Sequence, residues 1–173
     1  MPLTLGVSPP SNWAVCRLPV PDAQPGPPLQ LDSPTADGSG DTVDVRLDSG
    51  MVRIRLHAID APERAQAHGQ AAKEALSGLV FGQAVQVEPF EQDRYDRLVA
   101  RVWLGELDVN AEMIKRGYAW VYRRYADDPA YCAYEKAARD LKRGLWSPAQ
   151  PSVTAPWEWR RRKTIEGRFA DYS

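Results

Sequence analysis

Side chains suited to phosphodiester chemistry gather within one short stretch of the sequence, residues 41–63. Asp41 and Asp60 offer the hard carboxylate oxygens that calcium prefers, and Glu63 is a third carboxylate that could accept a proton from water. Arg55 lies between them, and its planar guanidinium matches two phosphate oxygens in a way that a lysine ammonium does not. A phosphate gains charge as water attacks it, so fixed cations and a metal ion would stabilise that reaction.

A second set of polar residues follows at positions 93–97, where the chain reads Asp-Arg-Tyr-Asp-Arg. Arg97 supplies another guanidinium that could bind a phosphate. Asp96 is its neighbour in the chain and is therefore a candidate to pair with it and draw it away from the phosphate. Aspartate also tolerates the positive backbone angle of a tight turn better than most residues, although less well than glycine.

Alternating side chains predict a β-hairpin that positions the first stretch. Apolar and polar residues alternate from position 42 to 48, Ser49 and Gly50 supply a turn, and the alternation continues to position 58. Antiparallel pairing would bring Asp41, at the start of the first strand, near Asp60, after the second. We therefore expect both carboxylates at one end of the hairpin, where a metal could bridge them.

These motifs resemble those of the staphylococcal nuclease family, also called thermonucleases, from about residue 40 to residue 146. The matching segments are Gly-Asp-Thr (40–42), Arg55, Asp-x-Pro-Glu (60–63), Asp-Arg-Tyr-x-Arg (93–97), Gly-x-Ala-Trp (117–120) and Gly-Leu-Trp (144–146). The resemblance implies a calcium-dependent endonuclease that hydrolyses DNA and RNA by in-line attack of water, with the bond to the 5′ oxygen broken. The implied roles are catalytic for Arg55, Glu63 and Arg97, calcium-binding for Asp41, Asp60 and the carbonyl of Ala61, and substrate-binding for Arg94, Tyr95 and Tyr125.

Two departures from the family pattern keep a second class of function open. Ser39 stands where the family has an aspartate, which predicts a weaker metal site, and Asp96 stands where the family has a glycine. The alternative is a barrel that binds nucleic acid or protein and has lost most or all of its catalysis. A degenerate copy of that kind is expected to lose an arginine or the glutamate, and this chain keeps Arg55, Arg97 and Glu63. A purely structural barrel would explain neither arginine.

Three residues also have simpler interpretations. Taken alone, Asp60 and Glu63 fit an ordinary helix start, with Asp60 as the capping residue and Glu63 completing a capping box. The matching positions of the other motif residues argue against it. His57 is expected to be a polar surface residue, because a single histidine without a partner is more often that than a catalyst.

The predicted fold is α+β and mainly β: a five-stranded barrel of the oligonucleotide-binding type with about three helices packed on it. Helical spacing is seen over residues 72–80. Asn110 is expected to cap a short helix that ends at Gly117, and Asp128 with Pro129 is expected to open a longer helix to Arg143. Residues 85–87 and 98–104 alternate as strands. The first strand is the weakest element, since its only apolar candidates are Leu29 and Leu31 and a proline follows.

Composition divides the chain of 173 residues into three expected parts. Residues 1–38 hold more than half of the 15 prolines and predict a linker or disordered arm. Residues 39–147 form the nuclease-like domain, and residues 148–173 form a tail rich in proline, tryptophan and arginine. The net charge of −1 does not by itself indicate a nucleic-acid binder. The basic clusters at 123–124 and 160–163 are either solvated charge or phosphate contacts.

The sequence says little about location or assembly. The N-terminus lacks the ordinary form of a secretory signal, whereas bacterial relatives in this family are often exported, so localisation stays open. No segment reaches transmembrane length, and we expect a monomer with nucleic acid as its partner.

Overall fold

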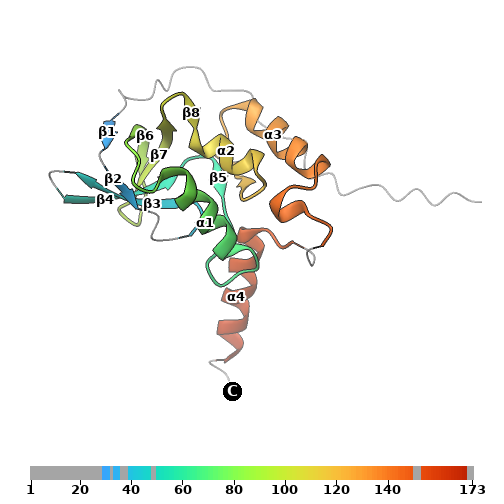
Figure 1. Ribbon diagram of the computed structural model, residues 1–173. Coiled ribbons are helices and arrows are strands. Elements are labelled where there is room, and N and C mark those ends of the chain that lie inside the picture. Colours follow the sequence, from blue (N-terminus) through green and yellow to red (C-terminus); the bar gives the residue numbers. More distant parts are fainter. Residues whose placement is uncertain (1–28, 32, 36–38, 48–49, 150–152, 171–173) are drawn as a thin grey trace, which may run out of the picture.

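A mixed sheet of seven strands forms the centre of the computed structural model, which describes residues 29–31, 33–35, 39–47, 50–149 and 153–170 (Figure 1). The strand order is β1-β6-β7-β4-β3-β2, with β8 paired to β7, and only the β4–β7 pair is parallel. A small second sheet joins β5 and β9. The strands are β1 (Leu29–Leu31), β2 (Ser33–Thr35), β3 (Thr42–Leu47), β4 (Gly50–Leu56), β5 (Ile59–Asp60), β6 (Val85–Gln92), β7 (Leu98–Leu104), β8 (Leu107–Asp108) and β9 (Trp120–Val121).

The predicted hairpin is confirmed as β3 and β4. Thr42 pairs with Arg55 and Leu47 with Gly50 in an antiparallel register. Val43, Val45, Ile54 and Leu56 are buried, as the alternation predicted, but Thr42 and Asp44 on the other face are buried as well. Of the predicted turn, Ser49 lies outside the described residues, and Gly50 begins β4 with a positive φ of 132°.

The weak first strand is present as two short pieces on either side of residue 32. β1 pairs with β6, at one edge of the sheet, and β2 pairs with β3, at the other. Pro34 lies in β2, at the edge, where a missing amide donor is tolerated. The α+β class is thus confirmed. Among the described residues the strand pairings do not close into a ring, so a closed barrel remains an expectation from the family.

In the described residues, four α-helices and a short 3-10 helix accompany the sheets: α1 (Gly69–Val80), α2 (Val109–Lys115), α3 (Pro129–Asp140), η1 (Gly144–Trp146) and α4 (Pro156–Ala170). Asp128 caps α3 as predicted, since its side chain accepts a hydrogen bond from the Ala130 amide. The expected helix 128–143 ends earlier, at Asp140. α4 was not predicted, because its sequence read as a tail. Among the helices that the structure describes, none has the length and apolar character needed to cross a membrane.

Two sequence expectations about single residues were wrong. Asp108, not Asn110, caps α2 by accepting a hydrogen bond from the Ala111 amide. Asn110 is instead fully buried and ties α2 to the sheet through the Val102 amide at 3.1 Å and the His57 carbonyl at 3.0 Å. A buried amide side chain needs such partners, because an unpaired polar group in the core is costly.

His57 is buried as well and is not a surface residue. Its ring stacks on Phe90 with 4.0 Å between ring centroids and 8° between planes. Burial lowers the pKa of His57, and the charge of Arg101 adds to this effect, while Asp127, 3.6 Å away, opposes it. His57 therefore belongs to the packing of the core.

Candidate active site

Asp41 is held in place where β3 begins. A residue with a Cβ at the preceding Gly40 would bring that atom within 2.5 Å of the Cβ of Ala72, so only glycine lets this segment pack so closely on α1. Asp41 is buried, with 3% of the residue exposed, and its carboxylate accepts hydrogen bonds from the Ser39 hydroxyl at 2.6 Å and the Ala61 amide at 2.8 Å. These contacts fix one carboxylate beside the segment that carries the next.

Arg55 joins the two buried carboxylates. Its Nη1 lies 2.8 Å from Asp41 Oδ2, and its Nη2 donates to Asp60 Oδ1 at 3.2 Å. Asp41 and Asp60 are therefore within the span of one guanidinium, as the hairpin predicted. The chain reverses at Ala58, which has a positive φ of 60°, and then enters β5 with Asp60.

Asp60 is the most enclosed acidic group of this site, with a side chain that is 0% exposed. Burial raises the pKa of the Asp60 carboxyl, and the hydrogen bond from Arg160 and the charge of Arg55 oppose that rise. β5 pairs with β9, so that Asp60 faces Trp120 across the small sheet. The tertiary structure thus links this carboxylate to an aromatic side chain sixty positions away.

Glu63 lies in the loop between β5 and α1, and no helix begins at Asp60, so the capping-box interpretation is wrong. The Glu63 side chain is 36% exposed. Its loop is closed by Gln66, whose amide donates to the Glu63 carbonyl at 2.8 Å and whose side chain donates to the Thr154 carbonyl at 2.5 Å. The loop that carries Glu63 is therefore attached to the segment that precedes α4.

Arg160, on α4, completes this cluster and was not identified from the sequence. Its guanidinium donates to both oxygens of Asp60, at 3.2 and 2.7 Å, and to Glu63 Oε1 at 2.6 Å. The basic cluster 160–163 had two interpretations, solvated charge or phosphate contacts. In the structure Arg160 fits neither interpretation, because it contacts two carboxylates. The three basic residues after it are exposed.

Arg97 belongs to a second group of residues in the loop between β6 and β7. The guanidinium is paired with Asp93 and not with Asp96, whose carboxylate accepts a hydrogen bond from Gln92. Asp96 has a positive backbone angle, with φ of 64°, which aspartate tolerates better than most residues. Parallel pairing of Arg55 with Val99 places the start of β7, and hence Arg97, beside the part of β4 that carries Arg55.

The three residues predicted to bind substrate lie in two places. Arg94 and Tyr95 are exposed in the Arg97 loop, where Arg94 Nη2 donates to the Tyr95 hydroxyl at 2.7 Å. Tyr125 lies instead on a run of aromatic rings. It contacts Tyr122 edge-on at 5.0 Å between centroids, and Tyr122 stacks at 6.2 Å on Trp157 of α4. The aromatic run therefore extends from Tyr125 to the helix that supplies Arg160.

Comparison with known proteins agrees with this geometry. The family described as staphylococcal nuclease homologue matches residues 53–148. The protein ParB of Escherichia coli is 44% identical to this chain over 133 residues, which cover 70% of this chain and 74% of ParB. A micrococcal nuclease of Shigella flexneri is 42% identical over 133 residues, with 70% of this chain and 75% of the nuclease covered. An uncharacterized endonuclease of Escherichia coli O157:H7 is 43% identical over 125 residues, with 72% and 80% covered.

The chain belongs to the staphylococcal nuclease family. Membership confirms the resemblance found in the motifs and, with it, the expected enzyme class, a hydrolase of the thermonuclease type. It also explains why carboxylates and arginines of the expected spacing gather at one end of the β3–β4 hairpin.

The residues of this staphylococcal nuclease homologue suit a hard cation in their chemistry. Asp41 and Asp60 present carboxylate oxygens that converge on one guanidinium, and calcium favours such ligands completed by water. Within the described ranges no three His, Cys, Asp or Glu side chains cluster closely enough to form a metal site by themselves. Asp41 and Asp60 are the carboxylates that converge on Arg55, and arginine side chains contact both.

Proposed function

We propose that this chain is a calcium-dependent nuclease that hydrolyses phosphodiester bonds in DNA and RNA. The observation that supports the proposal is the convergence of Asp41 and Asp60 on the guanidinium of Arg55, with Glu63 close by through Arg160. In this proposal Asp41, Asp60 and the carbonyl of Ala61 hold calcium. The bound ion would supply positive charge against which a phosphate oxygen and a water can be placed.

The protein groups would divide the remaining work. Arg55 and Arg97 would bind the equatorial phosphate oxygens and stabilise the charge that grows on them during attack. Glu63 would accept the proton of the water that forms the new bond to phosphorus, or would orient that water. The bond from phosphorus to the 5′ oxygen then breaks, and that oxygen takes up a proton.

Substrate contacts outside the reacting phosphate would come from two surfaces. Tyr125 is 44% exposed and could stack on a base, because every base offers a flat face. Arg94 and Tyr95 are exposed in the loop that carries Arg97. These contacts do not depend on sequence, which fits a nuclease that acts on both DNA and RNA.

The proposal is tested by incubating the purified chain with single-stranded and duplex DNA and with RNA, in calcium, in magnesium and in a chelator. We expect cleavage in calcium, little in magnesium alone and none in chelator, because the loose oxygen ligand set suits the larger ion. Glu63→Gln removes the proton acceptor and should lower the rate by about 100- to 10,000-fold while circular dichroism stays unchanged.

The alternative function, a binding module, gives a different result in the same experiment. Nucleic acid would bind in every condition without being cut. Full activity in chelator would contradict calcium dependence, and cleavage by Glu63→Gln at the parent rate would contradict the role of that carboxylate.

A further inference from the structure

The Arg160 guanidinium is hydrogen-bonded to carboxylate oxygens that the proposed calcium site would use. Asp60 receives three hydrogen bonds from cations: one from Arg55 on Oδ1 and two from Arg160, on Oδ1 and Oδ2. The Asp60 side chain is fully buried, so little of its surface is left for another partner. Glu63 is bound by the same guanidinium at 2.6 Å. A positive charge at this distance repels a second cation.

A docked helix, not a loose side chain, brings Arg160 to this position. Ala155, just before α4, is buried in a small core with Trp120 and Leu145. One turn before Arg160, the Trp157 ring lies 6.4 Å from that of Trp120. Figure 1 shows the N-terminal end of α4 beside the loop that precedes α1, with the rest of the helix directed away from the sheet.

The small core connects the helix to the strand that carries Asp60. Trp120 pairs with Asp60 across β5 and β9 and also packs on the rings of Trp146 and Trp157. The residue whose ring packs on α4 is thus also the backbone partner of Asp60. The ion pair is built into the fold, although the Arg160 side chain is 43% exposed and has room to turn outward.

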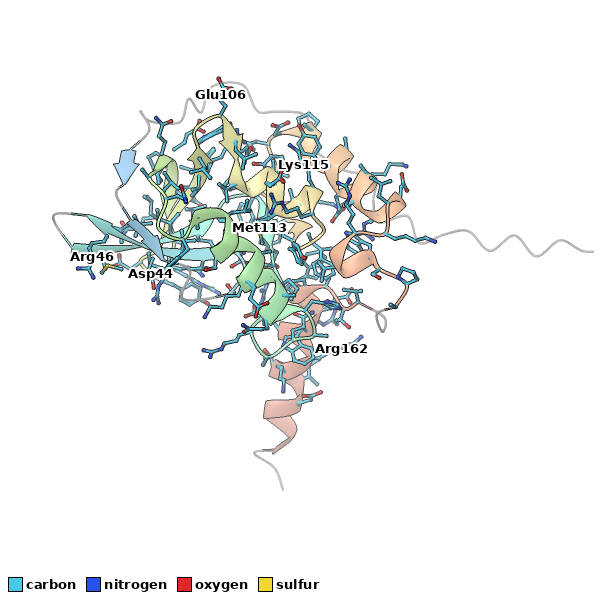
Figure 2. All side chains as sticks on the ribbon, viewed as in Figure 1. Asp44, Arg46, Glu106, Met113, Lys115 and Arg162 are labelled. Atoms are coloured by element: carbon cyan, nitrogen blue, oxygen red, sulfur yellow. The ribbon has the colours of Figure 1, made fainter. Side chains whose placement is uncertain are left out.

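The three basic residues that follow Arg160 provide a contrast on the same helix. Arg161, Arg162 and Lys163 are exposed, and Arg162 is labelled on α4 in Figure 2. The described part of the chain shows no hydrogen bond from these three side chains to Asp60 or Glu63, so loss of one of them changes the charge of the helix but not this ion pair.

We propose that Arg160 competes with the bound cation for Asp60 and Glu63 and so sets the calcium affinity of the site. The inference rests on the proposed function, since it takes Asp60 as a calcium ligand. When calcium binds, the guanidinium gives up at least one Asp60 oxygen and turns toward solvent. Arg160 thereby makes nuclease activity require a higher calcium concentration than the carboxylates alone would need.

The test measures binding of calcium alone, without nucleic acid, by isothermal titration calorimetry. Arg160→Gln should bind calcium about 3- to 30-fold more tightly than the parent chain, because charge-assisted hydrogen bonds no longer have to be broken. The partial exposure of Arg160 limits the size of this gain. Arg161→Gln makes the same charge change one position later and should bind calcium like the parent. Arg160→Lys keeps the charge without the two-pronged geometry and should give an intermediate affinity.

A second measurement separates competition from a structural role and covers the case in which Arg160→Gln is poorly folded. In chelator, Arg160→Gln should unfold at a lower temperature than the parent, and saturating calcium should reduce that difference. Calcium affinity equal to or weaker than that of the parent in both Arg160 variants, with Asp60→Asn abolishing binding, would overturn the inference and leave the calcium site intact. No calcium binding by any variant would overturn the proposed calcium dependence and the inference together.

Discussion

The Arg97 guanidinium is held by Asp93, four positions earlier in the same loop. Nε and Nη2 of Arg97 both donate to Asp93 Oδ2, at 2.9 and 2.7 Å. The other carboxylate oxygen accepts the backbone amides of Tyr95 and Arg97. Although partial burial opposes it, the hydrogen bonds from Arg97 hold the pKa of the Asp93 carboxyl below its usual value. One carboxylate thus orders both the loop and the arginine that it presents.

Removing the Asp93 carboxylate should reduce activity even though Arg55 and Arg97 are both retained. Asp93→Asn keeps the shape of the side chain but loses the charge that orients Arg97, so we expect kcat/KM to fall by about 10- to 100-fold. Asp96→Gly is the matched control in the same loop, because Asp96 pairs with Gln92 and has a backbone angle that glycine adopts easily. A parent rate in Asp93→Asn would show that Arg97 is positioned by the substrate alone.

The geometry of Arg55 can be separated from its charge. Arg55→Lys keeps one positive charge but cannot reach Asp41 and Asp60 together, nor bind a phosphate by two parallel hydrogen bonds, so turnover should fall by about a hundredfold or more. Steady-state kinetics at saturating calcium would measure this. Arg53→Lys, two positions earlier on β4, is the control: Arg53 pairs with Asp44, which Figure 2 labels, and should keep nearly the parent rate. Equal effects of the two substitutions would argue against a phosphate contact by Arg55.

Restoring the family's acidic residue at position 39 should strengthen the metal site. Ser39 donates to Asp41 Oδ1 at 2.6 Å, so an aspartate there would place a second carboxylate beside the first. We expect Ser39→Asp to lower the calcium concentration for half-maximal rate by about tenfold. In chelator the same variant should be less stable, because like charges repel. Ser39→Asn is the control, because asparagine is similar in size to aspartate but carries no charge. An unchanged calcium requirement in Ser39→Asp would count against any influence of position 39 on the metal.

The buried histidine predicts how stability depends on pH. The pKa of His57 is lowered from 6.5 by burial, so the unfolded chain binds more protons than the folded one between 6.5 and the lowered value. The contribution of His57 to the free energy of unfolding is therefore present above about 6.5 and is lost as the pH falls toward the native pKa.

His57→Phe keeps a ring against Phe90 and removes the titration, so its stability should fall less steeply in that pH window. Urea unfolding at a series of pH values would measure the difference between the two curves. His68→Asn replaces the chain's other histidine, half-exposed before α1, and should follow the parent. Parallel curves for His57→Phe and the parent would contradict a lowered pKa.

Features that depend on neighbours in the chain could be predicted from the sequence. The alternation around Val43 and Ile54 determined the β3–β4 hairpin, because side chains point to opposite faces with a period of two. Asp128 before Pro129 determined the start of α3 through a side-chain cap that acts within one turn. The residue types and spacing from Asp41 to Glu63 likewise predicted the reaction class and the family, because the pairing in the hairpin fixes which of these side chains lie close together.

Tertiary packing alone decided the rest, because it depends on contacts that no local pattern encodes. The sequence predicts a helix cap at Asn110, whereas its side chain is bound in the core, and it predicts an exposed His57, whereas Phe90 stacks on its ring. Arg160 lies a hundred positions from Asp60 and reads as one member of a basic cluster. The packing of Ala155 and Trp157 around Trp120 selects it from that cluster and places its charge against the two carboxylates.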